Sequence, residues 1–311
     1  MAPEGESHAL KGRPEKAVAG IALREGLYNA VWGWGVRMVH LGKCLGISGP
    51  FERASEKAAL RFIPAPKEEV EISLGTGIRL VVPPGFPRAR TYAAGTYERE
   101  VTYLFRTLVN EGMRVVDVGA FCGYYTLLAS RLVAASGQVY AFEADPDNYS
   151  YLLRNIEANG ISNVVSAERA VSNKTGIAAL ALHREADHRW LLSSQSSATS
   201  ITVQSVTLDD FFAQEGWPPI HLIKMDIEGG EMAALEGMRE LSRRNPHLAL
   251  IMEFDLANLR RAGATAEAVA TILQELGFGT GNTIEQGMKP FSVSAGLPRT
   301  DATYNLLLKK E

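Results

Sequence analysis

Cysteine is scarce in this 311-residue chain: only Cys44 and Cys122 occur, and they lie far apart in the sequence. Two such residues make neither a metal-binding pattern nor a disulfide framework, so we expect a reducing compartment, the cytoplasm. No uninterrupted apolar run is long enough to span a bilayer. The first twenty residues also lack the apolar core of a secretory signal.

An excess of positive charge is also missing. The formal net charge is -3, which gives no reason to expect a broad nucleic-acid-binding surface. Hydrophobic residues make up 46% of the chain and charged residues 22%, the proportions of an ordinary globular protein. We find no internal repeat.

The chain divides into three predicted parts. Residues 1–16 are polar and are predicted to be a disordered tail. Residues 17–94 form an extension with a helical pattern followed by VEISLGTGIRLVV, which predicts a β-hairpin turning at Gly75 and Gly77. The helix either packs on the rest of the chain or on a second subunit, or lies on a membrane surface. The oligomeric state stays open, and residues 95–311 form the main domain.

Strand and helix patterns alternate regularly in the main domain, which predicts an α/β fold with a Rossmann-like, mostly parallel sheet and helices on both faces. In such sheets ligands bind beyond the carboxyl ends of the strands. The predicted strands cover residues 113–120, 138–145, 163–171, 221–229, 247–255 and 302–310. The predicted helices cover residues 99–112, 124–137, 146–160, 205–216, 230–241 and 266–278.

The stretch VVDVGAFCGYYT, residues 115–126, predicts a cofactor turn between a strand and a helix. Gly119 and Gly123 lack the middle glycine of a dinucleotide-binding fingerprint, which allows a pyrophosphate to approach the backbone. Asp117 would repel a phosphate and attract a cation. S-adenosylmethionine carries an ammonium group and a sulfonium and no phosphate, so Asp117 suits its methionine end. The alternative is a helix cap or a structural carboxylate.

Five further residues complete the predicted cofactor site. Glu143 ends the next strand, where an acid accepts hydrogen bonds from ribose hydroxyls; alternatively it is a surface acid. Phe121 offers an apolar wall and Thr126 a hydroxyl. Ala170 and Val171 would face the adenine, unless they are core residues. Gly119 leaves space for the cofactor, so we expect Gly119→Val to abolish binding with the fold intact.

Several segments in order resemble the FkbM-type methyltransferases. They are GTYEREV, DVGAFCGYYTLLA, FEADPDNYSYLLRNIEANGISNV, AVSNKTG, SVTLDDF, IKMDIEGGEMAALEGM and the final NLLL, within residues 95–308. The resemblance implies a class I S-adenosylmethionine-dependent methyltransferase that acts on a hydroxyl of a natural product or a saccharide. It also places Glu98, from the first segment, at the cofactor site. Two alternatives are a non-catalytic cofactor-binding protein and a nicotinamide-dependent dehydrogenase.

Acids at strand ends are the candidate catalytic residues. Asp226 ends one strand, with Glu228 and Glu231 after it, and Glu253 ends the next strand. Lys224 shares a face with Asp226. One of these acids could take the proton of an acceptor hydroxyl. Asp226 could instead be structural, and Glu253 could pair with Lys224.

Two other arrangements stay open at these strand ends. Asp226 and Glu253 could hold Mg²⁺, although we do not favour a metal. A base could also come from His183 or His188, in a polar segment that includes Trp190 and could form a lid over the substrate.

Overall fold

The computed structural model describes residues 65–74, 77–182, 189–191, 200–298 and 303–310. The predicted tail, the predicted helical segment of residues 17–62, and both His183 and His188 lie outside the described residues. Within the described part, no helix combines the length and the apolar character needed to cross a membrane.

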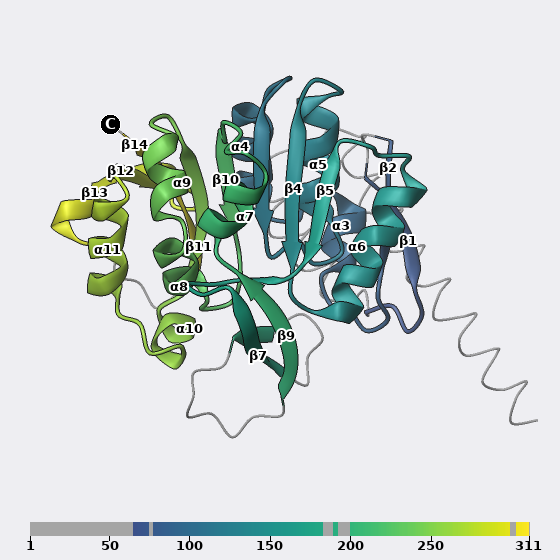
Figure 1. Cartoon of the computed structure of the whole chain (residues 1–311). Helices are drawn as coiled ribbons and strands as arrows, with labels where there is room; N and C mark the ends of the chain where they lie inside the picture. The colour runs from purple at the N-terminus through teal and green to yellow at the C-terminus, as the bar shows by residue number, and fades with distance from the viewer. Residues whose placement is uncertain (1–64, 75–76, 183–188, 192–199, 299–302, 311) are drawn as a thin grey trace, which may run out of the picture.

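An eight-stranded sheet forms the centre of the molecule (Figure 1), in the order β13-β12-β14-β11-β10-β3-β4-β5. The predicted α/β fold with a mostly parallel sheet is confirmed, since five neighbouring strands are parallel. They are β5 (Val164–Glu168), β4 (Gln138–Glu143), β3 (Arg114–Val118), β10 (Leu222–Met225) and β11 (Ala249–Phe254). Three antiparallel strands extend the sheet: β14 (Tyr304–Lys310), β12 (Phe278–Thr283) and β13 (Lys289–Ser292).

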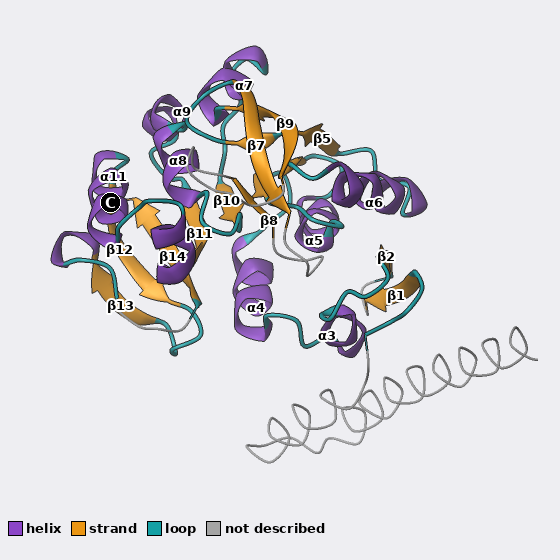
Figure 2. Cartoon of the chain, turned by 90° about the horizontal axis from the view of Figure 1, so that it is seen from below, coloured by secondary structure: helices purple, strands orange, loops and turns teal. Residues whose placement is uncertain are grey.

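Helices cover both faces of this sheet (Figures 1 and 2). One face packs against α7 (Leu208–Gln214), α8 (Glu231–Glu236), α9 (Arg239–Arg244) and α11 (Ala266–Glu275). The other face packs against α3 (Ala89–Ala94), α4 (Arg99–Leu108) and α5 (Tyr124–Val133). The remaining helices are α6 (Pro146–Ala158), α10 (Leu256–Arg261) and the short 3₁₀ helix η1 (Val293–Ala295).

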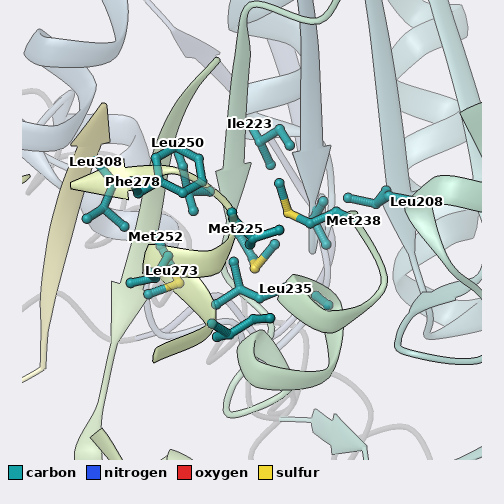
Figure 3. Close-up of a cluster of buried hydrophobic side chains, with 14 of the residues drawn as sticks. Leu208, Ile223, Met225, Leu235, Met238, Leu250, Met252, Leu273, Phe278 and Leu308 are labelled. Atoms are coloured by element: carbon teal, nitrogen blue, oxygen red, sulfur yellow. The ribbon is translucent and has the colours of Figure 1, made fainter. Parts of the chain in front are cut away.

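Side-chain alternation along the central strands determines where the polar residues lie. Ile223, Met225, Leu250 and Met252 all join the core cluster drawn in Figure 3. Because successive side chains of a strand point to opposite faces, Lys224 and Glu253 fall on the other face. Asp117 is the direct neighbour of Lys224 in the parallel register of β3 and β10. Three charged residues are thus gathered on one face at the carboxyl end of the sheet.

A second sheet of four strands was not predicted. It has the order β6-β9-β7-β8 and contains β6 (Ala170–Val171), β9 (Ser200–Val206), β7 (Gly176–Leu182) and β8 (Arg189–Leu191). The single strand predicted over residues 163–171 is wrong, because the chain turns at Arg169 and passes from the central sheet into this second one. Trp190, predicted to belong to a loop, lies in β8.

Two helix predictions need correction: one helix is divided in two, and the other ends earlier than predicted. The helix predicted over residues 230–241 is two helices, α8 and α9, which are separated at Gly237. A Cβ at Gly237 would lie 2.2 Å from the carbonyl oxygen of Ser172, so close backbone packing requires glycine there. Helix α5 ends at Val133 rather than at Gly137, because Ala134 has a left-handed φ of 56°.

The predicted hairpin is confirmed as the antiparallel pair β1 (Val70–Leu74) and β2 (Ile78–Val82). Asn155 of α6 fixes it: its amide nitrogen donates to the Val81 carbonyl over 2.8 Å, and its amide oxygen accepts from the Val81 N–H over 2.7 Å. Ile72 and Leu80 share one core cluster with Leu127 of α5. Residues 70–94 therefore pack on the predicted main domain, and the domain boundary at residue 95 stays a prediction.

Gly119 follows the end of β3 and packs against the residue that follows β10. Its φ is +86°, and a Cβ would lie 1.9 Å from the carbonyl oxygen of Asp226. The space that a side chain at Gly119 would occupy is therefore already filled by the backbone of Asp226, the residue that follows β10. The expectation that Gly119→Val would leave the fold intact is wrong, because any side chain here must displace that backbone.

We expect Gly119→Ala to lower the free energy of unfolding by roughly 2–4 kcal/mol, through left-handed strain and overpacking together. Gly160→Ala is the matched control, because Gly160 has a φ of +60° and nothing within 4 Å of the added Cβ. That variant should lose about 1–2 kcal/mol from strain alone. Urea titrations of both variants measure the difference, and equal losses would contradict the proposed clash with Asp226.

Candidate active site

A cavity opens beyond the carboxyl ends of β3, β4 and β10, where parallel sheets bind ligands. Eight of the predicted site residues line it: Asp117, Gly119, Phe121, Glu143, Ala170, Val171, Asp226 and Glu228. Four others are not among its lining residues: Glu98, Gly123, Thr126 and Glu253. The sheet therefore brings most, but not all, of the predicted residues to one place.

Asp117 is buried at the floor of the cavity, and only 3% of its surface is exposed. Burial raises the pKa of its carboxyl to about 6, against the opposing effects of Thr126 and Lys224. Thr126 donates its hydroxyl to Asp117 Oδ2 over 2.6 Å. Thr126 thus orients Asp117 from behind, rather than facing the cavity as predicted.

The amides of the glycine turn are already used by the protein. The N–H groups of Gly119 and Ala120 both donate to the Phe142 carbonyl, and that of Gly123 donates to the Ala120 carbonyl. The Phe121 N–H donates to Glu143 Oε2 over 2.7 Å. The turn therefore points few free donors at a ligand, unlike a phosphate-binding loop.

Glu143 connects this turn to the next helix. Its Oε2 accepts from Phe121, and its Oε1 accepts from the Asp145 N–H over 2.9 Å. These two backbone bonds fix the carboxylate, and Glu143 lines the cavity. Only 8% of Glu143 is exposed, so it is not a simple surface acid.

An aromatic wall, formed by Phe86, Tyr92, Tyr97, Phe121 and Tyr124, lines the same cavity. The Phe86 and Phe121 ring centroids are 4.8 Å apart, and those of Tyr92 and Tyr124 are also 4.8 Å apart. Of these residues, sequence reasoning selected only Phe121. The dense aromatic spacing of residues 86–97, which precede the cofactor turn, is the signal that could have revealed the wall.

Lys224 is a buried cation of the site, and only 1% of it is exposed. Its Nζ lies 3.1 Å from Asp226 Oδ2 and 4.7 Å from the centre of the Tyr125 ring. Burial alone would lower the pKa of Lys224, but the carboxylates of Asp226, Glu98 and Asp117 raise it above its usual value. The lysine therefore stays charged.

Glu98 is a further acid close enough to this cation to raise its pKa. Tyr125 donates its hydroxyl to Glu98 Oε2 over 2.7 Å, and Tyr125 rather than Glu98 lines the cavity. Glu98 begins α4 with a left-handed φ of 41°. Its place in the structure indicates that it orients Tyr125, which differs from the predicted contact with the cofactor.

Asp226, Glu228 and Glu253 bring one carboxylate oxygen each within 4.8 Å of one another. Burial, together with the charges of Asp226 and Glu228, raises the pKa of Glu253 well above its usual value. Asn258 donates to Glu228 Oε2 over 2.7 Å. The ion pair that was an alternative for Glu253 is formed by Asp226 instead, since the salt bridge of Lys224 goes to Asp226.

Three remaining candidates, Ala170, Val171 and Gly123, lie in the described part of the chain, and the histidines of the predicted lid do not. Ala170 and Val171 are buried and line the cavity, as part of β6 in the second sheet. Gly123 has a φ of +99° and a Cβ there would lie 2.8 Å from Leu152, so glycine is needed for the turn itself. The predicted lid with His183 and His188 lies outside the described residues.

Comparisons with known proteins give partial matches. A protein-L-isoaspartate O-methyltransferase of Methanothrix thermoacetophila is 39% identical over 56 residues, which cover 18% of this chain and 27% of the relative. The hexuronic acid methyltransferase AglP of Haloferax volcanii is 25% identical over 149 residues, which cover 45% of this chain and 56% of the relative. The chain thus spans about half, or less, of the length of these curated relatives.

A crystal structure of a methyltransferase FkbM from Methylobacillus flagellatus KT aligns with 71% of this chain and 53% of its own. Its sequence identity is 18% and the TM-score is 0.41.

The methyltransferase FkbM domain matches residues 117–279, which is more than half of the chain. The match begins at Asp117 of the cofactor turn and includes both Asp226 and Glu253. It leaves out residues 95–116 and 280–308, which the sequence resemblance had included. The predicted family is confirmed: this chain belongs to the FkbM methyltransferase domain family.

Proposed function

We propose that the protein transfers a methyl group from S-adenosylmethionine to a hydroxyl oxygen of a saccharide or a related natural product. The observation that carries the choice of cofactor is the glycine turn, whose amides bond Phe142, Ala120 and Glu143 rather than facing the cavity. The cavity presents Asp117 and Glu143, which suit a ligand with an ammonium group and ribose hydroxyls. The name of the Haloferax relative supports a saccharide acceptor.

Different residues of the cavity fit the different chemical groups of S-adenosylmethionine. Glu143 would accept hydrogen bonds from the ribose hydroxyls, and Asp117, held by Thr126, would face the ammonium group. Phe121 would supply an apolar wall, with Ala170 and Val171 beside the adenine. Gly119 and Gly123 would shape the turn without touching the cofactor, and Glu98 would act through Tyr125.

When bound, S-adenosylmethionine supplies a methyl carbon on a sulfonium, which is already a good leaving group. The chain's own task is to orient the acceptor hydroxyl and to remove its proton as the new carbon–oxygen bond forms. Asp226 is held in place by Lys224, and this ion pair favours the carboxylate form. Glu253, whose carboxylate lies within 4.8 Å of those of Asp226 and Glu228, receives the proton in this mechanism; burial and these neighbouring charges raise its pKa well above the usual value.

Cofactor binding tests the proposal directly. Two arginines, Arg88 and Arg169, also line the cavity, so side chains could hold a phosphate that the turn does not. We therefore compare thermal unfolding with S-adenosylhomocysteine and with NADPH. The first should raise the Tm, by an amount equivalent to roughly 2.7 kcal/mol when present at about 100 times its Kd. A shift with NADPH alone would reject the proposed cofactor and favour the dehydrogenase.

Glu143→Ala should weaken cofactor binding by roughly 1.5–3 kcal/mol through loss of charge-assisted hydrogen bonds. Isothermal calorimetry with S-adenosylhomocysteine measures this loss. Glu168→Ala is the matched control, because Glu168 ends the neighbouring strand in direct register with Glu143 and is exposed. Equal affinity of both variants would show that Glu143 does not hold the ribose.

Replacing the acids at the strand ends should affect catalysis at one position and acceptor binding at another. Glu253→Gln should lower kcat by roughly 10²–10⁴-fold, the usual contribution of a positioned base, and leave cofactor affinity unchanged. Because the pKa of Glu253 is raised, the wild-type rate should fall with acid at a pH above the usual glutamate range, and this limb should vanish in the variant. Rates of single turnover across pH measure both effects.

Asp226→Asn is the comparison variant, and it should leave the acidic limb in place while changing acceptor binding. EDTA is the second arm of this test: because the Lys224 ammonium already neutralises Asp226, we expect no loss of activity with chelator. Loss with EDTA and recovery with Mg²⁺ would instead assign the three carboxylates to a metal. An unchanged limb in Glu253→Gln would exclude Glu253 as the base.

A further inference from the structure

A second cavity lies beside the first and shares two of its lining residues, Tyr97 and Tyr124. The two ring centroids are 5.0 Å apart in an edge-to-face arrangement. One side of this ring pair thus faces the acids and Lys224, and the other side faces the second cavity. A ligand that passes these rings would contact both cavities at once.

The charged side chains among the described residues that line this second cavity are both positive. Among the described residues that line it, the charged ones are Arg99 and Arg106, and none is acidic. They stand seven positions apart on α4, two turns of the helix, so both fall on the same face. Both side chains are exposed. Guanidinium groups in this arrangement bind carboxylates and phosphates with paired hydrogen bonds.

An unusually exposed aromatic ring stands between the two arginines. Tyr103 lines the second cavity and is 74% exposed, more than any other large apolar side chain in the described part of the chain. A flat ring with a hydroxyl at its edge offers an apolar face and a hydrogen-bonding group together. This combination suits a sugar ring, which has an apolar face and hydroxyls at its rim.

Hydrogen bonds connect the floor of the second cavity to the first. Thr102 donates its hydroxyl to the Tyr97 carbonyl over 3.0 Å, and the same oxygen lies 3.3 Å from the Tyr125 hydroxyl. Tyr125 lies against Lys224 and donates to Glu98. The position of α4 relative to the acids of the first cavity is therefore held by side chains from both cavities.

We propose that the second cavity is an acceptor subsite that binds an anionic saccharide, with Arg99 and Arg106 on its carboxylate or phosphate and Tyr103 against its ring. This inference rests on the proposed function, because it extends the site for the same methyl acceptor. The target hydroxyl of such an acceptor would lie past Tyr97 beside Asp226, which lines the first cavity next to Glu253. The family match begins at residue 117, so these subsite residues of α4 lie before it.

Three probes distinguish the sources of the anionic group: methyl glucuronide, glucose 6-phosphate and the neutral methyl glucoside. Binding to the full-length protein is measured by calorimetry with S-adenosylhomocysteine present, and methyl transfer is measured separately. One or both acidic probes should bind more tightly than methyl glucoside. Arg99→Gln and Arg106→Gln should each weaken that binding by roughly 10- to 100-fold, as for one charge-assisted hydrogen bond.

Arg131→Gln is the matched control, since Arg131 is exposed on α5 and lines neither cavity. It should leave acidic probe binding unchanged, and all three variants should keep the wild-type affinity for S-adenosylhomocysteine. Equal binding of acidic and neutral probes, or of wild type and the arginine variants, would overturn the subsite. If the arginine variants lose probe binding but no probe is methylated by wild type, the subsite stands and the proposed saccharide methylation fails.

Discussion

One buried cation determines how the acids at the end of the sheet are arranged. Lys224 occupies a strand position that alternation directs into the core, and it is nearly inaccessible to water. A buried ammonium is costly unless carboxylates surround it, and Asp226 contacts it directly while Glu98 and Asp117 act from further away. The lysine in turn makes it possible for several carboxylates to gather in one cavity. Replacing Lys224 would therefore disturb the acids on three neighbouring elements together.

The backbone hydrogen bonds of the glycine turn distinguish this site from a phosphate-binding site at the end of a similar sheet. In a phosphate-binding turn the backbone N–H groups face the ligand. Here the Phe142 carbonyl and the Glu143 carboxylate accept those N–H groups, so the turn is closed on the protein itself. Glu143 consequently fixes the turn and also lines the cavity. Loss of its side chain would affect the shape of the site as well as a direct contact.

Much of the fold was predictable because its signals are local. Alternating strands and helices gave the parallel sheet, and the segment around Gly75 and Gly77 gave the hairpin. The division of residues 163–171 between two sheets was not predictable, because it depends on β9, about thirty residues further on, pairing with β6. Similarly, the break at Gly237 depends on the approach of Ser172, a contact that helical periodicity does not contain.

The candidate site was predictable where residues stand at strand ends, as Asp117, Glu143 and Asp226 do. Its other wall was not, since Phe86, Tyr92 and Tyr97 come from a segment that precedes the domain and meets the cofactor turn only in the folded protein. The matched domain starts at Asp117, so three rings of the wall and every lining residue of the second cavity except Tyr124 come before it. In the proposed function, the acceptor would therefore contact residues outside the matched domain as well as the acids inside it.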